Sequence, residues 1–165
     1  MRRAIPPADR RSLYALGGFL VLCFGVAALA SAVTLPAVRS WYPTLEKPAF
    51  TPPDWVFGPV WSVLYAAMAV AAWRAWRSVG DAERRRLALR IFALQLLLNL
   101  AWSFVFFGAK SPGAGVVVIV LLEAAILWTI ALFARLDRPA AWLMAPYAAW
   151  VAYAAALNIS ILRLN

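Results

Sequence analysis

Five long apolar runs constrain this 165-residue chain more than any other feature of its sequence. A membrane-spanning helix needs about 20 consecutive, predominantly apolar residues. The runs that reach this length are residues 13–35, 55–76, 87–107, 112–134 and 139–162. They lack the strict alternation of apolar and polar residues that is typical of barrel strands. The sequence therefore predicts an all-α integral membrane bundle of five transmembrane helices.

Composition agrees with this class. Hydrophobic residues make up 65% of the chain and charged residues 14%, whereas average soluble domains carry about 45–50% and about 25%. We expect a basic N-terminal tail at residues 1–12 and a single transmembrane domain at residues 13–165, with residues 36–54 as a long loop. No cleavable signal peptide is expected, because the first apolar run exceeds the roughly 7–15 residues of a signal sequence's apolar region.

The basic residues predict how the bundle is oriented. The net charge is +9, but the arginines flank apolar runs, so the lipid bilayer and not nucleic acid is the expected partner. Of the 16 Lys and Arg residues, 12 fall on the side of the N-terminus, and the exceptions are Arg39, Lys47, Lys110 and Arg163. The positive-inside tendency then places the N-terminus in the cytoplasm and the C-terminus across the membrane, and favours a bacterial inner membrane.

The residue types also exclude several chemistries. The chain has no histidine, and its single cysteine, Cys23, lies within an apolar run. Histidine ligation of zinc or haem and a disulfide framework are therefore excluded. No nucleophile–base pair and no phosphate-binding loop is recognisable, which favours a binding protein without a required cofactor over an enzyme.

Capping residues predict where the helices begin and end. Thr51 followed by two prolines and Asp54 is a box-like start signal for the second helix. Gly80 suits the end of that helix, and Asp81 suits the cap of the next one. The later start signals are Ser111 before Pro112 and Asp137 before Pro139.

The loop between the first two spans is unusual because it is rich in both proline and aromatic residues. Proline fixes φ, so this loop loses little entropy on ordering. Aromatic side chains prefer the headgroup zone, which leaves two interpretations open: an aromatic belt that anchors helix ends, or a lid over the mouth of a pocket. The rings concerned are Trp41, Tyr42, Phe50 and Trp55.

Three helical faces combine rings with polar groups. The second span carries Phe57, Trp61 and Tyr65 on one face, at a spacing of four residues. The third carries Gln95, Asn99 and Ser103, flanked by Trp102 and Phe106, and the fifth carries Trp150, Ala154 and Leu157, with Tyr147 and Asn158 on an adjacent face. Amides are costly in hydrocarbon, so these groups either link helices or line a cavity. A cavity of this kind, with ring walls and a small alanine, would suit a flat polycyclic ligand.

Two further features leave alternatives open. Glu123 lies near the middle of the fourth span, where it either couples proton movement to export or stays protonated and bonds to a neighbour. Alanines at a spacing of four residues either pack helices within the chain or form a homodimer seam. These alanines are Ala141, Ala145 and Ala149, then Ala148, Ala152 and Ala156, and in the first span Ala28 and Ala32.

Three segments together resemble the translocator protein family, also called tryptophan-rich sensory proteins or peripheral benzodiazepine receptors. They are W-Y-x-x-L-x-K-P-x-F-x-P-P-x-W-x-F-x-P-V-W-S-x-L-Y at residues 41–65, Q-L-x-L-N-L-A-W-S-x-x-F-F-G-A at residues 95–109, and P-Y-x-x-W-V-A-Y-A-x-x-L-N at residues 146–158. The resemblance implies a five-helix membrane protein, commonly a homodimer, that binds porphyrins such as protoporphyrin IX and other hydrophobic small molecules. It also implies a role in porphyrin transport or in light-dependent porphyrin breakdown.

The resemblance further implies which residues bind the ligand. They are Tyr42 and Pro52 from the loop, Trp61 and Tyr65 from the second span, Asn99, Trp102 and Ser103 from the third, and Trp150, Ala154 and Leu157 from the fifth. If porphyrin is degraded, Trp61 and Trp150 are the residues implicated. The family's sterol motif requires a tyrosine where this chain has Ile159, so sterol binding is not expected.

Overall fold

Five long helices make up the fold in the computed structural model, which describes residues 9–79 and 81–165. They are α1 (Arg10–Ser40), α2 (Asp54–Arg77), α3 (Ala82–Ser103), α4 (Pro112–Leu136) and α5 (Arg138–Leu164), with a 3₁₀ turn η1 (Tyr42–Thr44) and a π-helical turn η2 (Phe104–Gly108). All five are long and apolar enough to cross a membrane. The predicted all-α, five-helix membrane fold is therefore confirmed.

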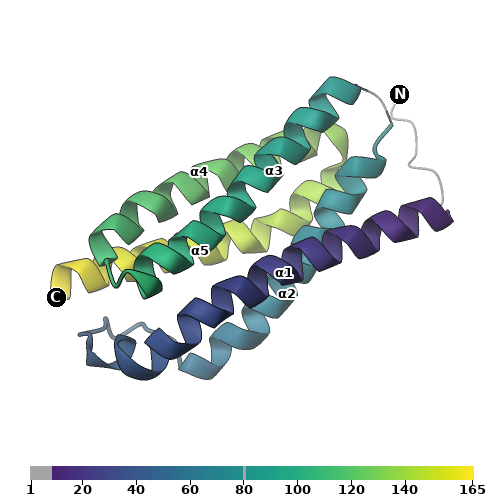
Figure 1. Cartoon of the computed structure of the whole chain (residues 1–165). Helices are drawn as coiled ribbons and strands as arrows, with labels where there is room; N and C mark the ends of the chain where they lie inside the picture. Colours follow the sequence, from purple (N-terminus) through teal and green to yellow (C-terminus); the bar gives the residue numbers. More distant parts are fainter. Residues whose placement is uncertain (1–8, 80) are drawn as a thin grey trace.

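The helices run back and forth along one axis (Figure 1). α4 packs against both α3 and α5, α2 packs against α5, and α1 lies along α2 at the edge of the bundle. Small residues allow the close approaches: a Cβ added to Gly115 of α4 would lie 2.8 Å from the Asn158 side-chain oxygen of α5. The first helix starts at the opposite end of the bundle from the C-terminus, as an odd number of spans requires.

The first helix extends beyond both expected ends. Asp9 caps its start by accepting a hydrogen bond from the Ser12 backbone N–H at 2.8 Å, so Arg10 and Arg11 are helical instead of belonging to a tail. The helix then continues through Pro36 to Ser40. Proline is tolerated inside membrane helices, although its missing N–H leaves the Ala32 carbonyl one turn earlier without its usual donor. In the last turn the Ser40 hydroxyl donates to the Pro36 carbonyl at 2.8 Å. The loop consequently covers residues 41–53, which is shorter than the expected 36–54.

The start of α2 was predicted wrongly. Its N-cap is Pro53 and not Thr51, and Thr51 instead donates its hydroxyl to the Pro48 carbonyl at 2.8 Å. A residue that precedes proline is disfavoured in helical conformation. Thr51 precedes Pro52, and Pro52 precedes Pro53, so neither residue favours a helix, and with Pro53 also extended the helix begins at Asp54.

The other helix ends agree better with expectation. Asp81 caps α3 by accepting from the backbone N–H groups of Glu83 and Arg84 at 3.0 and 3.1 Å, and the hydrogen bond from Arg84 is the main cause that lowers the pKa of Asp81. Pro112 opens α4 as predicted, although Ser111 forms no side-chain cap. Asp137 precedes α5 but pairs with Arg74 of α2, whose Nε lies 2.6 Å from the carboxylate. Gly80 lies outside the described residues.

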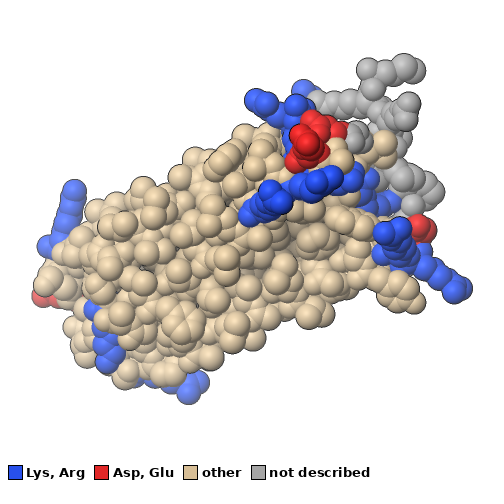
Figure 2. Space-filling view, turned by 45° about the horizontal axis from the view of Figure 1, so that its top comes forward, with Lys and Arg blue, Asp and Glu red and all other residues tan. Residues whose placement is uncertain are grey.

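Charged side chains gather at the two ends of the bundle and leave a broad uncharged band between them (Figure 2). Large apolar side chains are exposed in this band, for example Val21 at 75% and Leu97 at 63%. In water such exposure would be costly, whereas hydrocarbon solvates it. This surface and the five apolar helices make the chain an integral, multi-pass membrane protein.

Candidate functional site

A cavity of about 460 Å³ lies between α1 and the rest of the bundle. Helices α1, α2, α3 and α5 and both short turns contribute to its walls, and among the described residues α4 contributes none. Its size falls within the roughly 300–1,000 Å³ of small-molecule sites. The cavity contains most of the residues singled out in the sequence.

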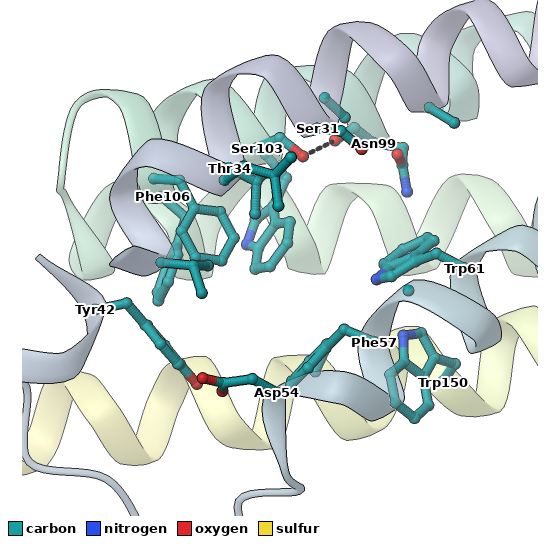
Figure 3. Close-up of a pocket in the computed structure, with 18 of the residues that line it drawn as sticks. Ser31, Thr34, Tyr42, Asp54, Phe57, Trp61, Asn99, Ser103, Phe106 and Trp150 are labelled. Atoms are coloured by element: carbon teal, nitrogen blue, oxygen red, sulfur yellow. Dashed lines mark hydrogen bonds between the residues drawn. The ribbon is translucent and has the colours of Figure 1, made fainter. Parts of the chain in front are cut away.

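Two groups of aromatic rings face each other across this cavity (Figure 3). The first comes from α2 and α5, where Phe57 and Trp150 meet edge to face with centroids 5.8 Å apart, beside Trp61. The second comes from α3 and η2, where Trp102 stacks on Phe106 with centroids 5.3 Å apart. The π-helical turn positions this second group, since it carries Phe106 and Phe107 about one turn after Trp102. The predicted ring stripes therefore point inward and wall a hollow.

A buried polar chain closes the deep end of the cavity. The Tyr65 hydroxyl donates to Asn99 Oδ1 at 2.6 Å, and Asn99 Nδ2 donates to the Tyr147 hydroxyl at 3.0 Å. These three side chains come from α2, α3 and α5, and each is at most 3% exposed. The sequence left two roles open for the amide of Asn99, and it has both: it links helices and it lines the cavity.

A second amide holds the ring cluster of α3 in place. Asn158 of α5 accepts from Trp102 Nε1 at 3.1 Å and donates to the Pro112 carbonyl of α4 at 2.9 Å. It therefore joins three helices at the point where the π-helical turn departs from regular α-helix. The cavity wall also contains an unsatisfied hydrogen-bond donor: Trp150 Nε1 is buried and has no hydrogen-bond partner among the described residues.

The mouth of the cavity carries the few ionisable groups. Tyr42 is only 6% exposed, and burial, followed by the nearby charges of Asp54 and Tyr153, raises the pKa of Tyr42 to about 12. Its hydroxyl is therefore protonated at neutral pH and faces the Asp54 carboxylate (Figure 3). Lys47 Nζ lies over the Tyr42 ring, 4.6 Å from its centroid.

The loop over this mouth is fixed to α5 at two points. Asn165 accepts from the Glu46 backbone N–H and donates to the Glu46 carbonyl, both at 3.0 Å. The Tyr153 hydroxyl donates to the Phe50 carbonyl at 2.6 Å. These anchors and the prolines favour the lid over a plain belt, although Trp55 at the rim is 75% exposed, as a headgroup anchor would be.

The structure brings nine of the ten predicted ligand-binding residues to the cavity wall. Pro52 is the exception: it lies before the Pro53 cap of α2 and does not line the cavity. Sequence reasoning missed the contribution of α1, which lines the cavity with small and polar residues such as Ala27, Ser31 and Thr34. The only available signal was the pair of hydroxyls three residues apart in an apolar run.

The remaining candidates lie elsewhere. Gln95 is fully buried one turn from Asn99 but does not line the cavity, and its oxygen has no partner among the described residues. Glu123 also lies outside the cavity, with one buried carboxylate oxygen that accepts no hydrogen bond from the described residues. Proton-coupled export through Glu123 therefore stays a prediction.

A five-helix membrane bundle with an aromatic cavity under a loop defines the class of this protein: an integral, multi-pass membrane protein with a cavity inside its bundle. Comparison with known proteins then places it: the chain belongs to the TspO/MBR family, whose model matches residues 19–164. It is 43% identical over 150 residues to the tryptophan-rich protein TspO of Chlorobaculum tepidum, covering 88% of this chain and 95% of that protein.

Two other relatives widen the comparison. The human translocator protein is 38% identical over 126 residues, which cover 76% of this chain and 75% of that protein. The tryptophan-rich sensory protein of Cereibacter sphaeroides is 36% identical over 147 residues, which cover 89% of both chains. The resemblance inferred from the three sequence segments is thus confirmed.

Proposed function

We propose that this protein is a membrane receptor or sensor that binds a flat, largely apolar ligand of the tetrapyrrole class, such as protoporphyrin IX, in the cavity beneath the loop. The observation that carries the proposal is the cavity of about 460 Å³ between two opposed aromatic clusters. Offset or edge-to-face ring contacts contribute about 0.5–1.5 kcal/mol each beyond burial. A macrocycle held between Trp61 and Trp150 on one side and Trp102 on the other would gain several such contacts.

Family membership supports the receptor or sensor part of this proposal, since relatives carry the names translocator protein and tryptophan-rich sensory protein. The geometry supports the ligand part. Deep polar groups such as Asn99 are occupied by Tyr65 and Tyr147, so the cavity offers a ligand mainly ring faces. The ionisable groups, Asp54 and Lys47, lie at the mouth, where the carboxylates of a tetrapyrrole would project.

We also propose that the N-terminus faces the cytoplasm of a bacterial inner membrane and that the chain forms a homodimer. The bias of 12 among 16 basic residues toward the N-terminal side supports the orientation. The alanines of α5 divide between two roles: Ala141 and Ala148 are buried in the core, whereas Ala149, Ala152 and Ala156 are exposed. Such an exposed small-residue ridge allows another helix to approach closely.

Replacing Trp61 by alanine is expected to weaken protoporphyrin IX binding about tenfold, because a lost aromatic contact of about 1.4 kcal/mol corresponds to that factor. Quenching of tryptophan fluorescence during titration in detergent measures the affinity. The matched control is Trp142→Ala, because Trp142 is 75% exposed on α5 and lies outside the cavity. Equal affinity for the two variants would refute the proposed site.

Replacing Asp54 by asparagine is expected to strengthen protoporphyrin IX binding about three- to tenfold. Two like charges about 5 Å apart repel by about 1 kcal/mol in water and more near a protein surface, and Asp54 is the carboxylate that lines the mouth. The dimethyl ester of the porphyrin should bind both forms equally, because it carries no negative charge.

The control for this charge effect is Glu46→Gln. Glu46 is exposed on the same loop, lies outside the cavity, and contacts Asn165 through its backbone only. Its substitution should leave both affinities unchanged. An equal gain for the ester and the free acid with Asp54→Asn would show that the effect is not electrostatic.

A further inference from the structure

A second hollow lies between the start of α3 and the end of α4, remote from the aromatic cavity. Its volume is about 530 Å³, and four arginines line it: Arg84, Arg86 and Arg90 of α3 and Arg135 of α4. Arg86 and Arg90 stand one turn apart on the same face of α3, where side chains four residues apart are neighbours. The two helices therefore converge several guanidinium groups on one space.

The hollow keeps a net positive charge despite two carboxylates in its lining. Asp81 accepts two backbone hydrogen bonds at the start of α3 and lies 3.7 Å from Arg84 Nε. Glu83 is the other acid, so four arginines against two carboxylates leave a charge of +2. Among the described residues, no carboxylate lies within 4.0 Å of a guanidinium of Arg86, Arg90 or Arg135. These three cations are available to an anion.

The depth of the hollow matches that of lipid headgroups. The continuous helical segment Ala82–Gly108 has 27 residues, which at 1.5 Å per residue gives about 40 Å, compared with about 30 Å of hydrocarbon. The charged residues of this segment all lie in its first turns, from Glu83 to Arg90, so we place the excess length at the start of α3, where the deeper arginines extend toward the interface. Figure 2 shows charged side chains gathered at this end, beyond the uncharged band.

An apolar path continues from the hollow along both helices. Its lining includes Leu87 and Leu132. Farther into the membrane, Leu94 is one turn beyond Arg90 and is 42% exposed, and Leu127 is two turns before Arg135 and is 53% exposed. A free phosphate would make no use of this surface, whereas an acyl chain below a bound headgroup would lie against it.

We propose that this hollow binds the phosphate of an anionic phospholipid, with Arg86, Arg90 and Arg135 around the headgroup and the acyl chains along the exposed leucines of α3 and α4. Arginine suits this task because its planar donors match phosphate oxygens. The phospholipid site is separate from the aromatic cavity, so this proposal does not depend on which ligand the aromatic cavity binds.

The test compares lipid retention by the full-length protein in detergent. Native mass spectrometry would count phosphatidylglycerol or phosphatidylcholine bound at equal added concentrations. The site variant carries Arg86→Gln, Arg90→Gln and Arg135→Gln. The control variant carries Arg10→Gln, Arg11→Gln and Arg138→Gln, which removes the same charge from exposed arginines outside the hollow. A single Arg90→Gln variant covers the case in which the triple variant fails to fold.

The wild type and the control variant are expected to prefer phosphatidylglycerol at least tenfold, because each arginine near an anionic surface contributes about fivefold. The site variant should lose this preference, and Arg90→Gln should reduce it about fivefold. Equal retention of both lipids by the wild type, or equal losses in the site and control variants, would overturn the proposal. Displacement of the lipid by millimolar inorganic phosphate would identify a free-anion site and would overturn the lipid assignment.

Discussion

Replacing Ala154 by tryptophan is expected to abolish measurable protoporphyrin IX binding, with a loss of at least thirtyfold. Ala154 lies on α5 between Trp150 and Leu157, and all three line the cavity. An indole added at this point occupies the space between the two ring clusters, and a rigid macrocycle cannot share it because protein interiors are close-packed. The protein itself should stay folded, since the indole enters an existing hollow instead of a packed core.

The matched control for this substitution is Ala124→Trp, which adds the same ring to an exposed position of α4 outside the cavity. Fluorescence titration gives the affinity of each variant, and thermal unfolding in detergent shows whether each is folded. Retained binding by a folded Ala154→Trp variant would mean that the ligand sits elsewhere. Loss of binding by Ala124→Trp would point to a general effect of added bulk.

Replacing Asn99 by leucine is expected to lower the free energy of unfolding by about 2–3 kcal/mol, because two buried hydroxyls lose their partner at about 1–1.5 kcal/mol each. Asn99 accepts from Tyr65 and donates to Tyr147, so its amide joins three helices. Unfolding by SDS in mixed micelles provides the measurement.

A rescue experiment separates the hydrogen bonds from the change in side-chain shape. Adding Tyr65→Phe and Tyr147→Phe to Asn99→Leu removes the orphaned hydroxyls, and apolar replacement of all partners in a buried network is often nearly neutral. At least half of the lost stability should return. A triple variant less stable than Asn99→Leu would show that side-chain fit, and not hydrogen bonding, dominates at this position.

The existence and order of the helices could be predicted from the sequence because hydropathy and length alone decide what crosses a bilayer. The residues at which the helices begin and end were harder to predict. Asp81 was predicted correctly as a cap, since its signal is local. Thr51 was predicted wrongly, because the constraint that two successive prolines place on the residues before them outweighs capping chemistry. Pro36 did not end its helix, which continues to Ser40, because a membrane helix tolerates the one carbonyl, that of Ala32, that the missing proline N–H leaves without its donor.

The contribution to the cavity was predictable for α2, α3 and α5, where rings and polar groups recur on one face, and not for α1, whose lining ring, Phe24, forms part of no such pattern. Trp61 and Trp150 form part of recognisable patterns, and the structure places both in the wall. The wall of α1 consists of residues such as Ala27 and Ser31, which differ little from the rest of an apolar span. The pairing of Asn99 with two tyrosines depends on how three helices meet, and spacing within one helix does not specify it.

Binding of the ligand inside the bundle is tested most directly by an experimental structure of the protein with protoporphyrin IX. We expect the macrocycle between α1, α2, α3 and α5, with Trp61 and Trp150 on one side and Trp102 on the other, and with its carboxylates near Asp54 and Lys47 at the mouth. A macrocycle on the lipid-facing surface, with the space between the two ring clusters empty, would contradict the account.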